Sequence, residues 1–342
     1  MSNFLHFSYI NLVFILTLIV IYRVSFYIKL LDYPNKRKIH SEPIPTIGGI
    51  IIFISMTFAT LIYKFDYDLL IFLYFSSLII FLGLIDDLYE INALARLLLQ
   101  VISTIIIIYF SIHITNLGNL NIFEIKVFSL NNLGFFGIIL TIFSIICLVN
   151  AFNFIDGLDG LASSIAIVAL ITLYIFKIYY SGFNFYGHNF LFIFLYFNLL
   201  FFLFNKNLFS NIKIFYGDSG STFVGFLIGW LLIYYAHPNN SFIHPVLAIW
   251  CITLPIFDFL YIILERLQKK LNPLKPDNYH IHHILLSKFK SENKTLFFLI
   301  ILSLLLNFFG LFIFIFFGSL VSLIMYIILF CIYFLILKRI KS

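Results

Sequence analysis

Charged residues are scarce in this sequence, in which Asp, Glu, Lys and Arg make up 11% of 342 residues. With 62% apolar residues and a mean hydropathy of +1.07, too few polar side chains remain to cover the surface of a soluble domain. Cysteine is equally rare: Cys147, Cys251 and Cys331 all fall in apolar runs and form no recognisable framework. The composition therefore excludes a soluble globular protein, and we expect the cysteines to be small buried hydrophobic residues.

Long apolar runs separated by short polar loops fill the chain. The last run, Leu296–Leu337, is too long for one span and is expected to divide near Phe317-Gly318-Ser319. No small-residue cleavage site follows the first run, so we expect a retained span there, not a signal peptide. The sequence predicts an all-α polytopic membrane protein of about 11 transmembrane helices, with residues 1–342 as a single domain. The other runs are Tyr9–Ile28, Ile47–Tyr63, Leu69–Leu84, Ala93–Ile112, Leu133–Val149, Leu161–Tyr180, Asn189–Phe204, Thr222–Ala236 and Ile243–Leu264.

Lysine and arginine are distributed unevenly between alternate loops. If the loop after the first run is cytoplasmic, only Lys64, Lys126 and Lys177 of the 21 basic residues lie on the outer side. Cytoplasmic loops of membrane proteins carry such an excess of basic residues. We therefore expect an outer N-terminus, a cytoplasmic C-terminus, and a short outer hairpin within residues 116–132, which the alternation over 122–128 predicts.

The stretch Asn150–Gly160 combines two amides, two carboxylates and two glycines directly after an apolar run. Ionised groups are costly at the end of a membrane span and usually mark a site. The oxygens of Asn150, Asn153, Asp156 and Asp159 are of the kind that a hard divalent cation such as Mg²⁺ prefers. Because glycine permits a sharp turn close to a ligand, this inner loop is the first candidate for a site.

Asp86 and Asp87 end the third apolar run. Adjacent carboxylates at that depth are costly unless they bind a cation or share a proton. One of the two could act as a general base, or either could bind metal. An N-cap role in the next helix remains an alternative for one of them, but it does not explain both.

Two further inner loops carry carboxylates. Gly217–Ser221 reads Gly-Asp-Ser-Gly-Ser and opens a helix, whose N-terminus attracts anions, so Asp218 could hold a metal bound to such an anion. The same turn also caps ordinary helices. Asp258 and Arg266 lie at the inner end of the ninth run, about 80° apart on an ideal helix, where a structural ion pair is the alternative to a role in binding.

Basic and imidazole side chains flank these carboxylates. Lys38 and His40, in a Pro- and Gly-rich loop, could contact a phosphate or nucleotide, although Lys36–Lys38 also fits a topology signal at lipid headgroups. Arg96 could clamp a phosphate or anchor its helix at the membrane surface.

Three histidines, His280, His282 and His283, lie within four residues of the last inner loop. A zinc site would need a fourth ligand nearby, often Cys, and no loop contains one. Contact between the imidazoles and a sugar or diphosphate fits better.

All of these groups fall on one predicted face of the membrane. A one-sided site favours an enzyme with a cytosolic substrate, and a site at the edge of the bilayer favours a lipid as the second substrate. Divalent metal with Lys, Arg and His indicates phosphoryl transfer. The rival class, a transporter of a phosphorylated solute, needs polar groups at mid-membrane and repeat-related halves, and the sequence has no internal repeat.

In their order and topology, these motifs resemble the polyprenyl-phosphate N-acetylhexosamine-1-phosphate transferases, which are glycosyltransferase family 4-type membrane enzymes of bacteria. The matching pieces run from Asp32 to His283, about three quarters of the chain. The His-Ile-His-His form is closer to the branch that transfers GlcNAc-1-phosphate than to the phospho-N-acetylmuramoyl-pentapeptide transferases of peptidoglycan synthesis, which are the alternative. Leu267 and Asn278 stand where related chains often have Arg, which leaves the donor sugar open.

The resemblance implies transfer of HexNAc-1-phosphate from a UDP-N-acetylhexosamine, UDP-GlcNAc above all, to undecaprenyl phosphate, with release of UMP. Such a reaction begins the synthesis of a cell-envelope polysaccharide such as O-antigen or teichoic acid. The resemblance also implies Mg²⁺ or Mn²⁺ as cofactor, no nucleic acid partner, and an active site on the cytoplasmic face of the bacterial inner membrane. The oligomeric state stays open, a homodimer included.

The resemblance further implies roles for residues in five catalytic loops, 32–49, 83–96, 150–161, 205–221 and 258–294. Asp218 would bind the metal beside Asn153. Asp86 or Asp87 would deprotonate the lipid phosphate or attack the donor, and Asp156 would approach the catalytic centre. The remaining residues would bind substrate: Asp159 and Asn205 near the uridine, Arg96 at a phosphate, Arg266, His280, His282 and His283 at the amino sugar, and Lys38, His40 and Asn150 at positions that the resemblance does not specify.

Overall fold

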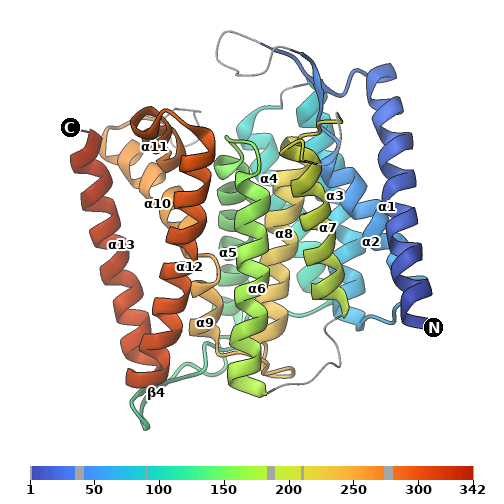
Figure 1. The fold of residues 1–342 in the computed structure, drawn as a ribbon. Helices are drawn as coiled ribbons and strands as arrows, with labels where there is room; N and C mark the ends of the chain where they lie inside the picture. The colour runs from blue at the N-terminus through green and yellow to red at the C-terminus, as the bar shows by residue number, and fades with distance from the viewer. Residues whose placement is uncertain are drawn as a thin grey trace.

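Helices make up most of the molecule, as Figure 1 shows. This structure, a computed structural model, describes residues 2–34, 42–89, 91–182, 189–208, 212–272 and 280–341. Lys38 and His40 lie outside the described residues. The helices are α1 (Ser2–Tyr27), α2 (Gly48–Ala59), α3 (Tyr67–Tyr89), α4 (Ala93–Phe110), α5 (Phe135–Ile155), α6 (Leu161–Ser181), α7 (Asn189–Asn205), α8 (Gly217–Ala236), α9 (Pro245–Trp250), α10 (Thr253–Gln268), α11 (Ile281–Phe289), α12 (Glu292–Phe317) and α13 (Ser319–Lys341).

Eight helices in the described part of the chain are long and apolar enough to cross a membrane, namely α1, α3, α4, α5, α6, α8, α12 and α13. The chain is therefore a polytopic membrane protein. The predicted division of the last run is confirmed, because α12 ends at Phe317 and α13 begins at Ser319, with Gly318 between them at φ +90°. Glycine adopts this left-handed conformation without the steric cost that other residues meet.

The other three expected spans differ from the prediction. Helix α2 has 12 residues and α7 has 17, so both are shorter than a standard span. The ninth run, expected as one helix over Ile243–Leu264, is divided into α9 and α10, with a break at Cys251 and Ile252.

Pro255 and Asn307 explain this break. Pro255 lies in the first turn of α10, where its missing N–H is tolerated, and it leaves the carbonyl of Cys251 without a helical donor. The buried Asn307 of α12 donates to that carbonyl over 3.3 Å. Irregular backbone at membrane depth requires such protein partners, because lipid offers none.

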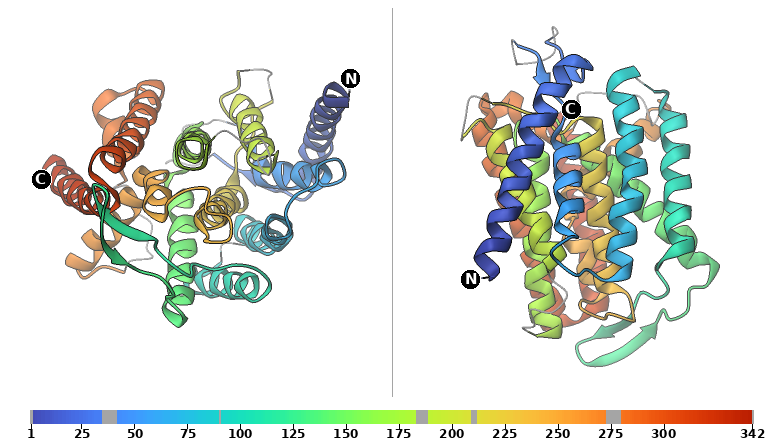
Figure 2. Two further views of the ribbon diagram at one scale, coloured as in Figure 1. Left: turned by 90° about the horizontal axis from the view of Figure 1, so that it is seen from below. Right: turned by 90° about the vertical axis from the view of Figure 1, so that its right-hand side faces the viewer.

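Helix α8 is the centre of the bundle and is buried along almost its whole length. It packs against α3 on one side and α5 on another, and also contacts α2, α6 and α9. Figure 2 shows this helix surrounded by the others when the bundle is viewed along its axis. Because Asp218 lies in the first turn of α8, the fold places this carboxylate in the middle of one end of the bundle.

Cys147 and Cys251 are buried as predicted, but the prediction is wrong for Cys331, which is exposed. It lies on α13, which Figure 1 shows at the edge of the bundle. An apolar run at the edge of a membrane protein has an exposed side that hydropathy alone cannot distinguish from its packed side.

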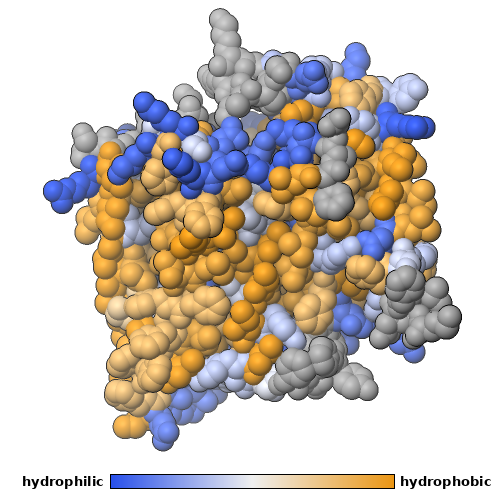
Figure 3. Space-filling model, viewed as in Figure 1, coloured by the Kyte–Doolittle hydropathy of each residue, from blue (hydrophilic) through white to orange (hydrophobic). Residues whose placement is uncertain are grey.

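Polar residues gather at the two ends of the bundle. Figure 3 shows a hydrophilic band above a broad apolar surface, at the end where Figure 1 places α11 and the C-terminus. The N-terminus and the hairpin lie at the opposite end. The predicted hairpin is confirmed, with β3 (Asn119–Ile122) paired antiparallel to β4 (Ile125–Ser129). The amide of Phe123 donates to the carbonyl of Phe317 over 2.9 Å, which fixes the hairpin to the α12–α13 turn.

Two short strands that the sequence did not predict pair with each other in the polar loop between α1 and α2. β1 (Leu31–Asp32) pairs antiparallel with β2 (Ile44–Pro45). The amide of Phe215 donates to the carbonyl of Pro45 over 2.8 Å, and the amide of Gly48 donates to the carbonyl of Phe215 over 2.9 Å. This loop is therefore joined to the segment that precedes α8, at the same end of the bundle as Asp218.

Candidate active site

Glycines allow α2 and α3 to approach the first turn of α8 at backbone distance. A Cβ atom on Gly83 of α3 would lie 2.2 Å from the Cα of Ser219, and one on Gly49 of α2 would lie 2.3 Å from the Cα of Gly220. No side chain fits at either position without movement of the backbone. This contact brings the end of α3, with its two carboxylates, against the start of α8.

We expect Gly83→Ala to lower activity at least tenfold and to destabilise the protein by about 1–3 kcal/mol, as overpacking does in well-packed cores. The added methyl group must displace the backbone at Ser219, and therefore Asp218. Gly229→Ala on α8 is the matched control, since its Cβ would meet the mobile end of the Ile145 side chain at 2.8 Å. Thermal unfolding in detergent and turnover check both variants, and equal behaviour would contradict this explanation.

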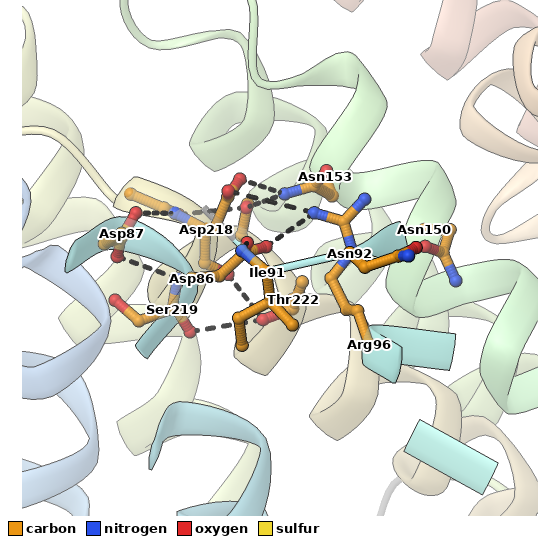
Figure 4. A network of polar contacts seen from close by, with 12 residues as sticks. Asp86, Asp87, Ile91, Asn92, Arg96, Asn150, Asn153, Asp218, Ser219 and Thr222 are labelled. Atoms are coloured by element: carbon orange, nitrogen blue, oxygen red, sulfur yellow. Dashed lines mark hydrogen bonds and ion pairs between the residues drawn. The ribbon is translucent and has the colours of Figure 1, made fainter. Parts of the chain in front are cut away.

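Asp87 caps the N-terminus of α8 from a different helix. Its Oδ1 accepts from the amide of Asp218 over 2.8 Å and its Oδ2 from the amide of Ser219 over 3.2 Å (Figure 4). Gly217 makes room for it, with φ +72° and a would-be Cβ only 2.7 Å from the carboxylate. The anion that the helix N-terminus attracts is thus a side chain of the protein itself.

Asp86 faces the α3–α4 turn instead. Its Oδ1 accepts from the amide of Ile91 over 2.8 Å, and its Oδ2 accepts from Nη1 of Arg96 over 2.6 Å. The adjacent Asn92 is the N-cap of α4 and accepts from the amide of Leu94. Asp86 therefore closes this turn and holds the guanidinium of Arg96.

Asp218 has a partly exposed carboxylate. Asn153 donates from Nδ2 to its Oδ1 over 2.6 Å, and Nη1 of Arg96 lies 3.9 Å from its Oδ2. The side chain of Asp218 is 41% exposed, whereas that of Asp86 is 5% exposed, so Asp218 can take another ligand more readily than Asp86 can. The prediction that Asn153 lies beside Asp218 is confirmed.

These residues fit a Mg²⁺ ion that a substrate helps to hold. Within the described ranges, no three His, Cys, Asp or Glu side chains are grouped closely enough to hold a metal ion by themselves. Mg²⁺ commonly uses one or two carboxylates and completes its shell with water and phosphate oxygens. Asp218 supplies one accessible carboxylate, and Asn153 could rotate its amide oxygen towards the same ligand.

Asn150 lies one helical turn before Asn153 but faces α4. Its Nδ2 donates to Oε1 of the buried Gln100 over 2.9 Å and to the carbonyl of Ile146 over 2.8 Å. These contacts join α5 to α4 and so support the position of the Arg96 helix.

Asp156 follows the last residue of α5, and its carboxyl has no hydrogen-bond partner among the described residues. Desolvation, followed by the negative charges of Asp218, Asp159 and Asp87, raises the pKa of Asp156 to about 8. The side chain is nevertheless exposed to solvent, which limits the effect of desolvation on this pKa. A cation bound nearby would offset the neighbouring negative charges. Asp156 can therefore exchange a proton near neutral pH.

Asp159 and Asn205 hold the far end of the same loop. Oδ2 of Asp159 lies 2.5 Å from Nζ of Lys213, in a half-buried ion pair. The buried Asn205 accepts from the amide of Gly160 over 2.5 Å and donates to the carbonyl of Ile214 over 2.8 Å. Asn205 thus joins the 150–160 stretch to the segment before α8.

We expect Asn205→Ala to lower stability by about 1–3 kcal/mol for each buried backbone group left without a partner. If this is the main function of Asn205, stability and turnover should fall together. A selective rise in the KM for a nucleotide donor at unchanged melting temperature would instead support the predicted uridine contact. Asn293→Ala is the control, since Asn293 makes only an exposed contact with Lys206.

Asp258 of α10 anchors residues 280–283, which we call the histidine segment. Oδ2 of Asp258 lies 2.8 Å from Nδ1 of His280, and Oδ1 accepts from the amide of Ile281 over 2.9 Å. His280 packs edge-on against Phe154, with ring centroids 5.2 Å apart. The Arg266 guanidinium lies 5.7 Å from the centroid of the same ring.

His282 is buried against the 150–160 stretch. A Cβ on Gly157 would lie 2.1 Å from its Nε2, so only glycine fits beneath this imidazole. Burial and then the neighbouring imidazoles of His283 and His280 hold the pKa of His282 well below its usual value. His282 is therefore neutral and packs as part of the structure, and His283 lies beside it with ring centroids 4.1 Å apart.

The 150–160 stretch thus contacts three other described parts of the site. It reaches Asp218 through Asn153, the histidine segment through Phe154 and Gly157, and Lys213 through Asp159. The convergence of the acidic loops is as the sequence predicted. Three contributions were missed: Phe154 as the ring shared by Arg266 and His280, Lys213 as the partner of Asp159, and Asp258 as the anchor of His280.

Similarity to known proteins extends over most of the chain. The sequence profile of a family described as Glycosyl transferase family 4 matches residues 69–236. A protein of Haemophilus influenzae named undecaprenyl-phosphate alpha-N-acetylglucosaminyl 1-phosphate transferase is 34% identical over 275 residues, 79% of this chain and 75% of its own. Proteins of the same name from Pasteurella multocida and Escherichia coli (strain K12) are 35% and 27% identical, and the matches span 75% and 71% of their lengths.

Proposed function

The chain belongs to glycosyl transferase family 4, and from this membership and its site we propose that it transfers HexNAc-1-phosphate to undecaprenyl phosphate. The donor in this proposal is a UDP-N-acetylhexosamine, first of all UDP-GlcNAc, and UMP leaves. The names of the related proteins contain both the acceptor and the N-acetylglucosaminyl group, which supports this choice.

One observation carries the proposal: carboxylates of α3 and α8 and an amide of α5 converge at one end of the bundle, where polar loops meet an apolar surface. A phosphorylated lipid can present its headgroup there while its chain stays in the bilayer, and a nucleotide can enter from water. At the opposite end, where the hairpin lies, the described carboxylates of Asp66 and Asp68 accept from the hydroxyl groups of Tyr234 and Ser111.

In the proposed reaction, an oxygen of the lipid phosphate attacks the donor phosphorus that carries the sugar. The bond from that phosphorus to the UMP oxygen breaks, and the sugar phosphate becomes the outer phosphate of a lipid diphosphate. Like charges meet in this step, so cationic groups must offset their repulsion. Arg96, held by Asp86 beside Asp218, supplies one fixed positive charge.

The predicted cofactor Mg²⁺ would be held by Asp218 with Asn153, and would neutralise charge on the phosphates. Asp87 holds the start of α8, and hence Asp218, in position. The predicted bases Asp86 and Asp87 both have hydrogen-bonded carboxylates. Asp156, whose carboxyl lacks such bonds among the described residues, is the additional candidate for proton exchange.

We further propose that residues 1–342 act as one domain in the bacterial cytoplasmic membrane, with this site at the cytoplasmic face. The excess of Lys and Arg in the loops at this end supports that orientation. We also propose that the product begins a cell-envelope polysaccharide.

Release of UMP tests the proposal. Membranes containing the protein are incubated with Mg²⁺, undecaprenyl phosphate and one labelled donor: UDP-GlcNAc, UDP-GalNAc or UDP-N-acetylmuramoyl-pentapeptide. We expect UDP-GlcNAc to give UMP and a labelled lipid diphosphate in equal amounts. No reaction with any donor would overturn the proposal, and turnover of the pentapeptide donor alone would place the chain in the peptidoglycan branch.

A further inference from the structure

Asp258 binds the histidine segment at two points that serve different purposes. Its Oδ1 accepts from the backbone amide of Ile281, which fixes the start of α11, and Tyr333 donates to the same oxygen over 3.3 Å. Its Oδ2 contacts only a side chain, the imidazole of His280, over 2.8 Å. Asp258 is 1% exposed, so these contacts are shielded from solvent.

This pairing determines how His280 can bind a ligand. An ionised carboxylate only accepts hydrogen bonds, so Nδ1 of His280 must carry the proton in this contact. A carboxylate behind an imidazole also fixes the tautomer and the ring orientation, as it does in metal sites and catalytic triads. His280 is 5% exposed, and its Nε2, which has no hydrogen-bond partner among the described residues, is the ring nitrogen left for a substrate.

His282 cannot serve the same purpose. It is 1% exposed, neither ring nitrogen has a hydrogen-bond partner within the described ranges, and its Nε2 faces Gly157. The contact with Gly157 fixes the distance between the histidine segment and the loop that carries Asp156. Of these two imidazoles, only His280 combines a fixed orientation with an available nitrogen.

The position of His280 indicates which substrate it meets. The ring lies against Phe154, and the Arg266 guanidinium lies near the same ring, so two nitrogen donors flank one aromatic side chain. Such a pair suits phosphate oxygens. Helix α11 has nine residues and lies at the polar end of the bundle, away from the apolar surface where the lipid approaches.

We propose that Asp258 is a positioning residue for the donor: it presents Nε2 of His280 to the diphosphate of the UDP-sugar. The proposal rests on the proposed function for the identity of the donor. It assigns a role in recognition to Asp258, for which the sequence left a structural ion pair with Arg266 as the alternative.

Asp258→Asn tests this proposal with little structural change. The amide oxygen can still accept from the amide of Ile281, but the amide NH₂ now faces Nδ1, which must give up its proton. We expect the KM for the UDP-sugar to rise at least tenfold, with the KM for undecaprenyl phosphate and the melting temperature nearly unchanged. Asp68→Asn is the matched control, a carboxylate that Ser111 contacts over 2.6 Å at the far end of α3, and it should leave both KM values unchanged.

A double variant distinguishes the positioning of His280 by Asp258 from a general loss of structure. In His280→Gln the imidazole is lost, so adding Asp258→Asn should cause no further rise in the donor KM. Independent, multiplying effects would overturn the proposal, and so would an unchanged donor KM or equal rises in both KM values. If the unaltered protein releases no UMP from any donor, the proposed function fails instead, so the two failures are distinguishable.

Discussion

Asp218→Ala is expected to lower turnover by roughly a thousandfold or more while the protein still inserts and folds, since it removes the one accessible carboxylate beside Arg96. The loss has two physical parts. A metal held partly by substrate phosphates loses the carboxylate that Asp218 supplies, and Asn153 loses its hydrogen-bond acceptor over 2.6 Å. The phosphates of donor and acceptor then meet without the metal ion that would neutralise most of their charge.

The measurement is UMP release at increasing Mg²⁺ concentration, after the metal has been removed with EDTA. The unaltered protein should regain activity with Mg²⁺ or Mn²⁺, whereas the variant should stay inactive at all concentrations. Asp68→Ala, at the opposite end of the bundle, is the control for loss of a carboxylate. Near-normal Mg²⁺-dependent activity in Asp218→Ala would refute the assignment of the metal to Asp218.

Asp87→Asn is expected to lower turnover at least a hundredfold and to lower the melting temperature as well. The carboxylate accepts from two backbone amides at the start of α8. An Asn side chain can accept only one of these bonds, and its NH₂ group would face the other amide. One unsatisfied buried donor costs about 1–3 kcal/mol, and the helix N-terminus loses its neighbouring negative charge.

Thermal unfolding and kcat, measured on the same preparation, separate the two roles of Asp87. A large fall in kcat with a small fall in melting temperature would favour the predicted base, and parallel falls would favour the capping role seen in the structure. A variant with nearly full activity would contradict both and would move the base elsewhere, for example to Asp156.

Hydropathy and backbone chemistry were enough to predict most of the fold. Apolar runs gave the helices, and Gly318 gave the division between α12 and α13. The α9–α10 break could not be predicted in this way, because the run over Ile243–Leu264 is apolar at Cys251 and Ile252, where the break lies. Pro255 was the available signal, but the donor that makes the break tolerable, Asn307, comes from a helix far along the chain.

The sequence predicted which residues lie at the site, but it did not predict what each of them does there. Carboxylates at the ends of spans are rare enough to be recognised singly, so Asp87 and Asp218 could both be chosen. Asp87 caps the helix that carries Asp218 because Gly49 and Gly83 let α2 and α3 approach that helix closely. The spacing of residues in the sequence does not reveal these contacts. The Asp258–His280 pair was missed because helical spacing relates Asp258 to Arg266 and says nothing about a loop 22 residues away.

The capping of α8 by Asp87 joins residues 131 positions apart. A nascent chain that has inserted its first seven helices therefore has no active centre, however well those helices pack. Competence to act on the carrier lipid can arise only after the ribosome has passed Ser219, and the histidines of the site follow later still, once His280 has been made. Incomplete chains left in the membrane by stalled synthesis would thus be catalytically silent.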